Sequence, residues 1–184
     1  MVQFSYRKKF TFKMIFVRFV WELTYYLFFK TTPRWCLNNW RVFLLKIFGA
    51  KIGYGCKISP NCSVWAPWNL EIGNKTAIAN KVNLYSMDKI LIGNNVTISQ
   101  YSFICTGSHD ISFLNLPIKT KKIEICDYVW ICSKSIILPG CKIGKYSVVG
   151  AGSVLPKSIG EKSIVLGNPA RVIKKRKIKI EKIK

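Results

Sequence analysis

A period of six residues is the feature of this sequence that most restricts its fold. An Ile, Val or Leu recurs at this spacing from residue 52 to residue 155, with short slips after residues 70 and 90 and one longer break. Such a unit does not match the helical period of about 3.6 residues, and it is too short for a strand–helix–strand crossover. Each unit therefore predicts one short strand and one turn. The repeating positions are Ile52, Ile58, Val64, Leu70, Ile72, Ile78, Leu84, Ile90, Ile92, Ile98, Ile104, Ile125, Ile131, Ile137, Ile143, Val149 and Leu155.

Three such units per coil predict a triangular parallel β-helix, in which the aliphatic residue points inward and each coil covers the edge of its neighbour. Small residues recur at two other positions of the unit, as tight corners between closely stacked coils require. The second position holds Gly53, Gly73, Gly93, Gly144 and Gly150, and the fifth holds Cys56, Cys62, Thr76, Ser102, Ser135, Cys141, Ser147 and Ser153. The sequence therefore predicts an all-β fold.

Most of the seven cysteines also follow the repeat. Cys105, Cys126 and Cys132 take the second position of their units, and three others take the fifth. This placement favours small buried fillers over metal or redox chemistry. There is no C-x-x-C pair, so we expect no metal site, and no signal peptide opens the chain, so we expect a reducing, cytoplasmic location.

The longest break in the repeat runs from residue 105 to 124 and reads CTGSHDISFLNLPIKTKKIE. We expect a loop extruded from the β-helix, a place where a rigid scaffold leaves side chains available for ligands. The loop carries His109, the only histidine of the chain and the residue type best suited to general-base work near neutral pH. Cysteine nucleophiles, a three-histidine zinc site and nucleotide-binding glycine loops find no support in the sequence.

Residues 1–50 lack the repeat and hold 15 of the 25 aromatic residues. Thr32-Pro33 predicts the start of a helix that continues to Gly49, with Trp40, Phe43, Leu44, Ile47 and Phe48 at helical spacing. The apolar stretch 14–29 contains Arg18 and Glu22 and is shorter than the roughly 20 residues of a bilayer span. Two interpretations remain: a helical cap on the open end of the β-helix, or an interfacial anchor on acidic lipid.

The net charge of +22 is concentrated at the two ends of the chain. Residues 1–50 hold nine basic residues against one acidic residue, and residues 171–184 hold eight against one. This pattern indicates an anionic partner such as a lipid surface or a phosphate-bearing ligand, although a general bias towards lysine gives the same excess. No nucleic-acid-binding motif accompanies the charge, so we expect no nucleic-acid partner.

Four segments together resemble the hexapeptide-repeat O-acetyltransferases, and most closely the group typified by colanic acid biosynthesis acetyltransferases. They are WRVFLLKIFGAKIG at 40–53, IGNNVTISQYSFICTGSHD at 92–110, VWICSKSIILPGCKIGKYSVVGAGSVLPKSI at 129–159, and GNPARVIKK at 167–175. The resemblance implies a left-handed parallel β-helix, a homotrimer with sites between subunits, and acetyl-CoA as the donor.

The resemblance also implies roles for individual residues. His109 would take the proton of an acceptor hydroxyl, and the backbone N–H groups around Ser133 would stabilise the oxyanion. Ala151 and Gly152 would lie against the pantetheine arm of the donor. Lys157, Arg171 and Lys174 would meet its phosphates, with Pro156 replacing a threonine of the galactoside and maltose enzymes, and Asn83 and Asp110 would face the acceptor.

We therefore predict three parts: an N-terminal cap or membrane-peripheral segment (1–50), a β-helix catalytic domain (51–158) and a basic C-terminal segment (159–184). The expected function is O-acetylation of a sugar hydroxyl during exopolysaccharide or capsule synthesis, on a carbohydrate acceptor that a lipid carries at the inner membrane face. Two alternatives stay open. The acceptor could be a free sugar, an amino sugar or an antibiotic hydroxyl, or the chain could be a non-catalytic β-helix binding module.

Overall fold

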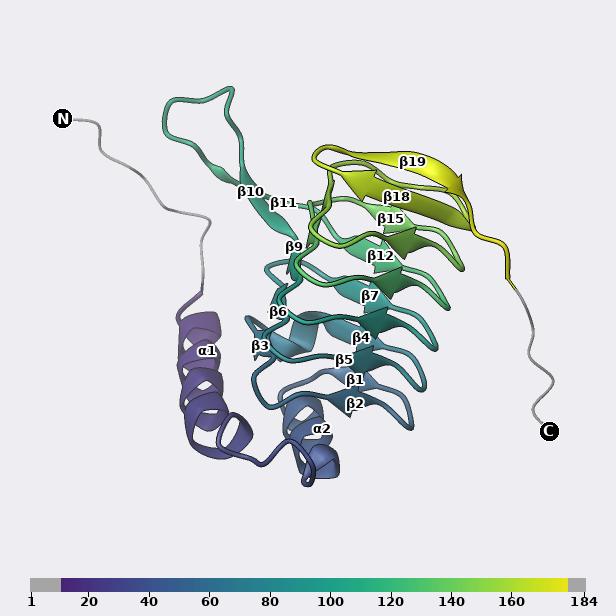
Figure 1. Ribbon diagram of the computed structural model, residues 1–184. Coiled ribbons are helices and arrows are strands. Elements are labelled where there is room, and N and C mark those ends of the chain that lie inside the picture. Colours follow the sequence, from purple (N-terminus) through teal and green to yellow (C-terminus); the bar gives the residue numbers. More distant parts are fainter. Residues whose placement is uncertain (1–10, 179–184) are drawn as a thin grey trace, which may run out of the picture.

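The computed structural model describes residues 11–178 and is dominated by a parallel β-helix whose coils stack along one axis (Figure 1). Three sheets form its sides. Sheet A contains β1 (Lys51–Ile52), β4 (Leu70–Ile72), β7 (Ile90–Ile92), β12 (Ile123–Ile125) and β15 (Lys142–Ile143). Sheet B begins with β2 (Lys57–Ile58), β5 (Ala77–Ile78), β8 (Thr97–Ile98), β13 (Trp130–Ile131) and β16 (Val148–Val149). Sheet C contains β3 (Ser63–Val64), β6 (Asn83–Tyr85), β9 (Phe103–Cys105), β14 (Ile136–Ile137) and β17 (Val154–Leu155).

The aliphatic positions of the repeat form the core. In sheet A, for example, Ile52, Ile72 and Ile92 are parallel partners on successive coils. All of the repeating positions are at most 7% exposed, and the small fifth-position residues are buried at the corners. The predicted fold class, a parallel β-helix of hexapeptide repeats, is confirmed.

The glycines at the second position allow the coils to stack. A Cβ atom on Gly73 would lie 2.7 Å from the carbonyl carbon of Gly93 on the next coil. A ladder of side-chain amides and carboxylates runs beside these glycines: Asn74 N donates to Asn94 Oδ1 at 2.8 Å, and Asn94 N donates to Asp127 Oδ1 at 2.9 Å. The corner is therefore held by polar contacts that repeat once per coil.

One β-hairpin leaves the β-helix at the corner between sheets C and A. It consists of β10 (Gly107–His109) paired antiparallel with β11 (Ile118–Thr120) and projects away from the coils (Figure 1). Its base is closed by Lys121 N, which donates to the carbonyl of Thr106 at 2.9 Å. The extruded loop of the predicted fold class is thus an ordered hairpin.

The N-terminal residues form α1 (Phe12–Thr24), a π-helical segment η1 (Tyr25–Phe29) and α2 (Asn38–Ile47). Both helices contact the first coil and donate to its edge: Trp21 Nε1 donates to the carbonyl of Val64, and Arg41 Nε donates to the carbonyl of Ile58, each at 2.8 Å. Within residues 11–178, no helix combines the length and apolar character that crossing a bilayer demands.

The predicted start of the second helix at Thr32-Pro33 is wrong, because α2 begins at Asn38. The Asn38 side chain pairs with the first coil as a strand would. Its Nδ2 donates to the carbonyl of Cys56 at 2.8 Å, and its Oδ1 accepts from Ile58 N at 2.9 Å. This tertiary contact replaces local capping and fixes where the helix begins.

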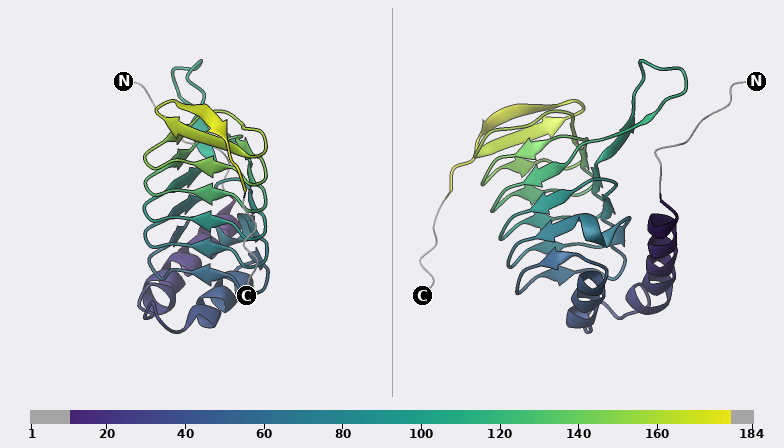
Figure 2. Two further views of the ribbon diagram at one scale, coloured as in Figure 1. Left: turned by 45° about the vertical axis from the view of Figure 1, so that its right-hand side comes forward. Right: turned by 180° about the vertical axis from the view of Figure 1, so that it is seen from behind.

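At the other end, β18 (Ser163–Gly167) pairs in parallel with β16 and antiparallel with β19 (Ala170–Lys175). The strands β18 and β19 cover the last coils, at the end of the β-helix remote from α2 (Figure 2). The short η2 (Pro67–Asn69) lies between β3 and β4, where the sequence slips by two residues.

Candidate active site

His109 ends β10 and lies on the exposed hairpin. Its Nδ1 is 2.6 Å from the carbonyl oxygen of Leu116, across the hairpin. A carbonyl oxygen only accepts, so in the neutral ring the proton is on Nδ1 and the lone pair is on Nε2. The hairpin therefore fixes both the orientation of the imidazole and the nitrogen that can take a proton.

Asp110 follows His109 and holds the tip of the same hairpin. Its carboxylate forms an ion pair of 2.6 Å with Lys119 and accepts a hydrogen bond of 3.1 Å from the amide of Ser112. The bond from Lys119 is the main reason that the pKa of Asp110 lies below the usual carboxyl range, and the Ser112 amide adds to it. The contacts of Asp110 connect the two arms of the hairpin that positions His109.

Asn83, the second acceptor candidate, lies at the start of β6 on the outer face of sheet C and is half-buried. Tyr85 and Phe103 flank it on the same sheet, with ring centroids 6.1 Å apart. The base of the hairpin packs on this surface, since a Cβ atom on Gly107 would lie 3.0 Å from Tyr85 Cε1. A polar side chain with aromatic neighbours thus lies beside the hairpin that carries His109.

Ser133, Ala151 and Gly152 are grouped at the opposite edge of sheet C, at the corner between sheets B and C. Gly152 N donates to the carbonyl of Ser133 at 2.9 Å, so their turns stack directly. Ala151 and Gly152 are exposed, and no atom lies within 4 Å of the place that a Cβ on Gly152 would take. This corner can accommodate an elongated ligand against its backbone.

The three basic candidates are exposed but dispersed. Arg171 is paired with Leu166 near the B–C corner, and Lys174 lies further along β19. Lys157 follows β17 at the C–A corner, the corner at which the hairpin leaves an earlier coil. Within one chain, the structure brings Ser133, Ala151 and Gly152 together near Arg171, and keeps Lys157 and His109 on the other side of sheet C.

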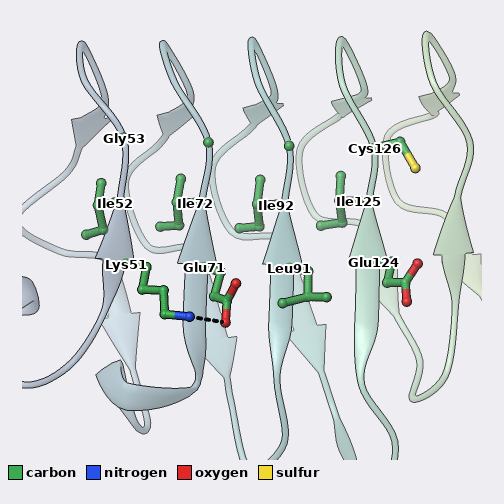
Figure 3. Close-up of a pocket in the computed structure, with 12 residues that line it drawn as sticks. Lys51, Ile52, Gly53, Glu71, Ile72, Leu91, Ile92, Glu124, Ile125 and Cys126 are labelled. Atoms are coloured by element: carbon green, nitrogen blue, oxygen red, sulfur yellow. Dashed lines mark hydrogen bonds and ion pairs between the residues drawn. The ribbon is translucent and has the colours of Figure 1, made fainter.

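The outer surface of sheet A forms a shallow groove of about 550 Å³ (Figure 3). One side is lined by the charged side chains of Lys51, Glu71 and Glu124, and the other by Gly53, Gly73 and Gly93. Its two carboxylates are neutralised by lysines. Glu71 lies 3.2 Å from Lys51, and Glu124 lies 2.6 Å from Lys122, which is the main reason that the pKa of Glu124 is lowered. A carboxyl whose pKa is lowered is a poor general acid, so Glu124 is unsuited to that role.

The buried and half-buried thiols of the β-helix are equally unsuited to nucleophilic chemistry. Burial raises the pKa of Cys62 to about 12 and raises the pKa of Cys105, Cys126, Cys132 and Cys141 as well. Thiols of this kind are poor nucleophiles. The residues that the structure describes include no cluster of three or more His, Cys, Asp or Glu side chains able to hold a metal ion.

The sequence interpretation missed two contributors to the site. The carbonyl of Leu116 orients the imidazole, and a main-chain acceptor cannot be predicted from the pattern of side chains. Lys119 pairs with Asp110, but a lysine in a lysine-rich loop gives no signal of its own. Both contacts depend on the hairpin register, which pairs His109 with Ile118.

Comparison with known proteins gives consistent matches. A family model described as "Bacterial transferase hexapeptide (six repeats)" matches residues 122–157. The chain is 41% identical over 140 residues to the Escherichia coli (strain K12) protein named "Putative colanic acid biosynthesis acetyltransferase WcaF", covering 76% of this chain and 77% of that protein.

Two solved structures share the fold. A hexapeptide-repeat-containing acetyltransferase from Vibrio cholerae, complexed with acetyl coenzyme A, superposes with a TM-score of 0.84 over 97% of each chain at 23% identity. A maltose O-acetyltransferase from Clostridium difficile 630 superposes with a TM-score of 0.78 at 29% identity, covering 91% of this chain and 90% of the other.

Proposed function

The chain belongs to the hexapeptide-repeat acetyltransferases, and from this premise we propose that it transfers an acetyl group from acetyl-CoA to a sugar hydroxyl, with His109 as the general base. Membership in the family establishes the type of reaction. The identity of the base, the acceptor and the assembly are the parts that we propose.

The observation that carries the proposal is the contact of His109 Nδ1 with the carbonyl of Leu116 at 2.6 Å. Because it puts the lone pair on Nε2, that atom can accept the proton of an acceptor hydroxyl while the hydroxyl oxygen bonds to the acetyl carbon. The C–S bond then breaks, and the proton on Nε2 passes to the leaving thiolate. Acceptor, acetyl group and proton are all accounted for without a metal.

The B–C corner fits the donor. The open position beside Gly152 and the exposed Ala151 permit close approach of a pantetheine arm, and Arg171 lies nearby to meet a phosphate. The backbone N–H groups around Ser133 are candidates for stabilising the oxyanion. We propose that Lys174, further along β19, and Lys157, at the C–A corner, also meet the donor phosphates.

The separation of these residues supports a homotrimer. In one chain, the hairpin that carries His109 leaves the C–A corner, while Ser133 and Gly152 lie at the B–C corner, at the opposite edge of sheet C. A single transfer step needs base and donor within contact distance. A site formed between the hairpin of one subunit and the B–C corner of a partner subunit satisfies that need, and a cyclic assembly repeats it.

The proposed acceptor is a saccharide of an extracellular polysaccharide or capsule. Asn83, Tyr85 and Phe103 provide an amide and aromatic rings beside the hairpin, a combination suited to sugar hydroxyls and sugar faces. The relative from Escherichia coli is named for colanic acid biosynthesis, which agrees with this class of acceptor. The proposed location is cytoplasmic.

Acetyl-CoA binding measured by calorimetry at physiological salt tests the donor, with ATP as the control because a protein of charge +22 attracts phosphates. We expect saturable acetyl-CoA binding much tighter than ATP binding. Equal affinity for both would remove the support for a donor site. An acceptor screen by mass spectrometry then identifies the acceptor among polysaccharide repeat units, free sugars, amino sugars and hydroxylated antibiotics. If none of these compounds were acetylated, the result would favour a non-catalytic binding module.

A further inference from the structure

The outward face of the N-terminal helix is apolar, and none of residues 11–178 covers it. We define the outer stripe as the residues of α1 and η1 that recur at helical spacing on this face: Phe12, Ile15, Phe16, Phe19, Leu23, Tyr26 and Leu27. Each is more than half exposed, from 52% for Leu23 to 85% for Phe12. Monomeric soluble surfaces seldom carry a continuous apolar stripe of this length, so the stripe indicates a binding surface.

The opposite face of α1 packs on the β-helix, and most of the outer stripe takes no part in that packing, although Ile15 and Phe19 also border a hollow with Trp65 and Trp68. Trp21 is 1% exposed and Phe29 is 0% exposed, and their ring centroids lie 6.0 Å apart. Arg18 lies 4.2 Å above the ring of Trp65 in the first coil. A helix docked by one face normally presents polar residues on the other, and α1 instead presents phenylalanines.

The apolar surface continues onto α2. Trp40 Nε1 donates to the carbonyl of Phe28 at 3.0 Å, which joins the two helices, and the Trp40 ring lies 5.7 Å from that of Phe43. Trp40, Phe43 and Ile47 are 40%, 50% and 61% exposed. Aromatic rings therefore run from one helix to the next, in the composition typical of segments that lie at a membrane–water interface.

The charges beside the outer stripe specify its partner. Glu22 is the only acidic residue of residues 1–50, and Arg18 neutralises it at 2.8 Å. Lys13 and Lys30 are exposed along the same segment, and Lys30 lies 5.2 Å above the ring of Tyr26. A second copy of this chain docked stripe to stripe would bring the same cations into opposition, whereas an anionic surface complements them.

We propose that the outer stripe docks the protein on an acidic lipid membrane, with the phenylalanines in the interface and the lysines at the lipid phosphates. The helix lies on the membrane and does not cross it. This inference goes beyond the proposed function and does not depend on it, since docking requires neither acetyl-CoA nor His109.

Docking through the outer stripe would also determine where the hairpin that carries His109 lies relative to the membrane. The hairpin β10–β11 and helix α1 project from the same side of the β-helix (Figures 1 and 2). A protein docked through the outer stripe therefore holds His109 on the side that faces the lipid, where an acceptor anchored in the membrane would be presented.

Co-sedimentation of the full chain with vesicles tests the docking. One set of vesicles mixes phosphatidylglycerol with phosphatidylcholine, and the other contains phosphatidylcholine alone. We expect binding to the acidic vesicles, weaker binding as salt is raised, and a loss of about tenfold or more in partitioning for the double variant Phe16→Ser/Phe19→Ser. The matched control is Val172→Ser/Ile173→Ser, which removes two exposed apolar residues from β19 and should bind as the parent does.

Three outcomes would overturn the proposal. The parent could fail to bind acidic vesicles, or Phe16→Ser/Phe19→Ser could bind them undiminished, which would assign the binding to charge elsewhere. A fall in solution mass for Phe16→Ser/Phe19→Ser without lipid, seen by light scattering, would show that a second copy covers the stripe. Circular dichroism checks that each variant is folded, and unchanged acetyl-CoA binding by Phe16→Ser/Phe19→Ser separates this test from that of the proposed function.

Discussion

The carbonyl oxygen of Leu116 lies 2.6 Å from Nδ1 of His109, on the opposite arm of the hairpin. Leu116 has a positive φ of 44°, and its amide donates to the carbonyl of Phe113 at 3.0 Å, so a tight turn aims this carbonyl at the ring. The main chain of the hairpin thus orients the imidazole. The hairpin is therefore part of the catalytic apparatus that we propose.

Replacing His109 by glutamine should abolish acetyl transfer while leaving donor binding intact. We expect the rate of acetyl transfer to fall by about 10²- to 10⁴-fold, because the amide cannot accept the hydroxyl proton. The dissociation constant for acetyl-CoA should stay the same, since the proposed donor residues lie at the B–C corner. Ser108→Ala, the preceding position on the same strand, is the control, and appreciable turnover by His109→Gln would exclude His109 as the base.

The hairpin should lose order at acid pH through Asp110. The pKa of Asp110 is lowered in the folded protein, chiefly by Lys119. The contribution of Asp110 to the stability of the hairpin is therefore complete above the ordinary carboxyl pKa of about 3.9, and it is lost as the pH falls through the lowered pKa. The protection of the Ser112 amide from hydrogen exchange, taken relative to the intrinsic exchange rate at each pH, should therefore fall at low pH. Asp110→Ala should lose this protection at every pH, and Lys119→Gln should be intermediate because the Ser112 bond remains. Protection that does not change with pH in the parent would contradict this role.

A methyl group at Gly73 should destabilise the coil stack. The added Cβ would lie 2.7 Å from Gly93 C and 2.8 Å from its oxygen, and backbone on a neighbouring coil cannot move aside. Gly73→Ala should lower the free energy of unfolding by about 1–3 kcal/mol in denaturant titrations. Gly160→Ala is the control, because no atom lies within 4 Å of its added Cβ, and it should change stability by less than about 0.5 kcal/mol. Equal stability of the two variants would refute the packing argument.

Arg41 should be essential to the junction between helices and β-helix. It is 2% exposed, and its guanidinium donates to the carbonyls of Ile58, Pro33 and Cys36 and to the hydroxyl of Thr32. Arg41→Met leaves the buried Ile58 carbonyl and Thr32 hydroxyl without this donor, so thermal and denaturant unfolding should show a loss of about 2–4 kcal/mol.

Lysine at position 41 should recover only part of this stability, because one ammonium cannot reach acceptors spread around a planar guanidinium. The exposed Arg34→Met serves as the surface control, with an expected change within about 0.5 kcal/mol. If Arg41→Met were as stable as Arg34→Met, the buried network would have no role in joining the helices to the first coil.

The repeat could be predicted from the sequence because its information is local. Ile98 and Ile131 are parallel partners on successive coils, and both are buried. Such a position is buried whichever coil lies above it, because every coil points an aliphatic side chain into the core at the same place. The start of α2 could not be predicted in this way. Asn38 begins the helix because its side chain pairs with Cys56 and Ile58, residues that become neighbours only after the first coil has formed.

The sequence by itself thus determined the β-helix, the place of the extruded segment and the one histidine within it, because periodicity and residue type act over six residues at a time. Only the tertiary structure decided which nitrogen of His109 is protonated and that Ser133 and Gly152 lie across sheet C from it. It alone showed that one face of α1 is covered and the other exposed. These properties depend on distances between segments remote in the chain, and no local pattern encodes them.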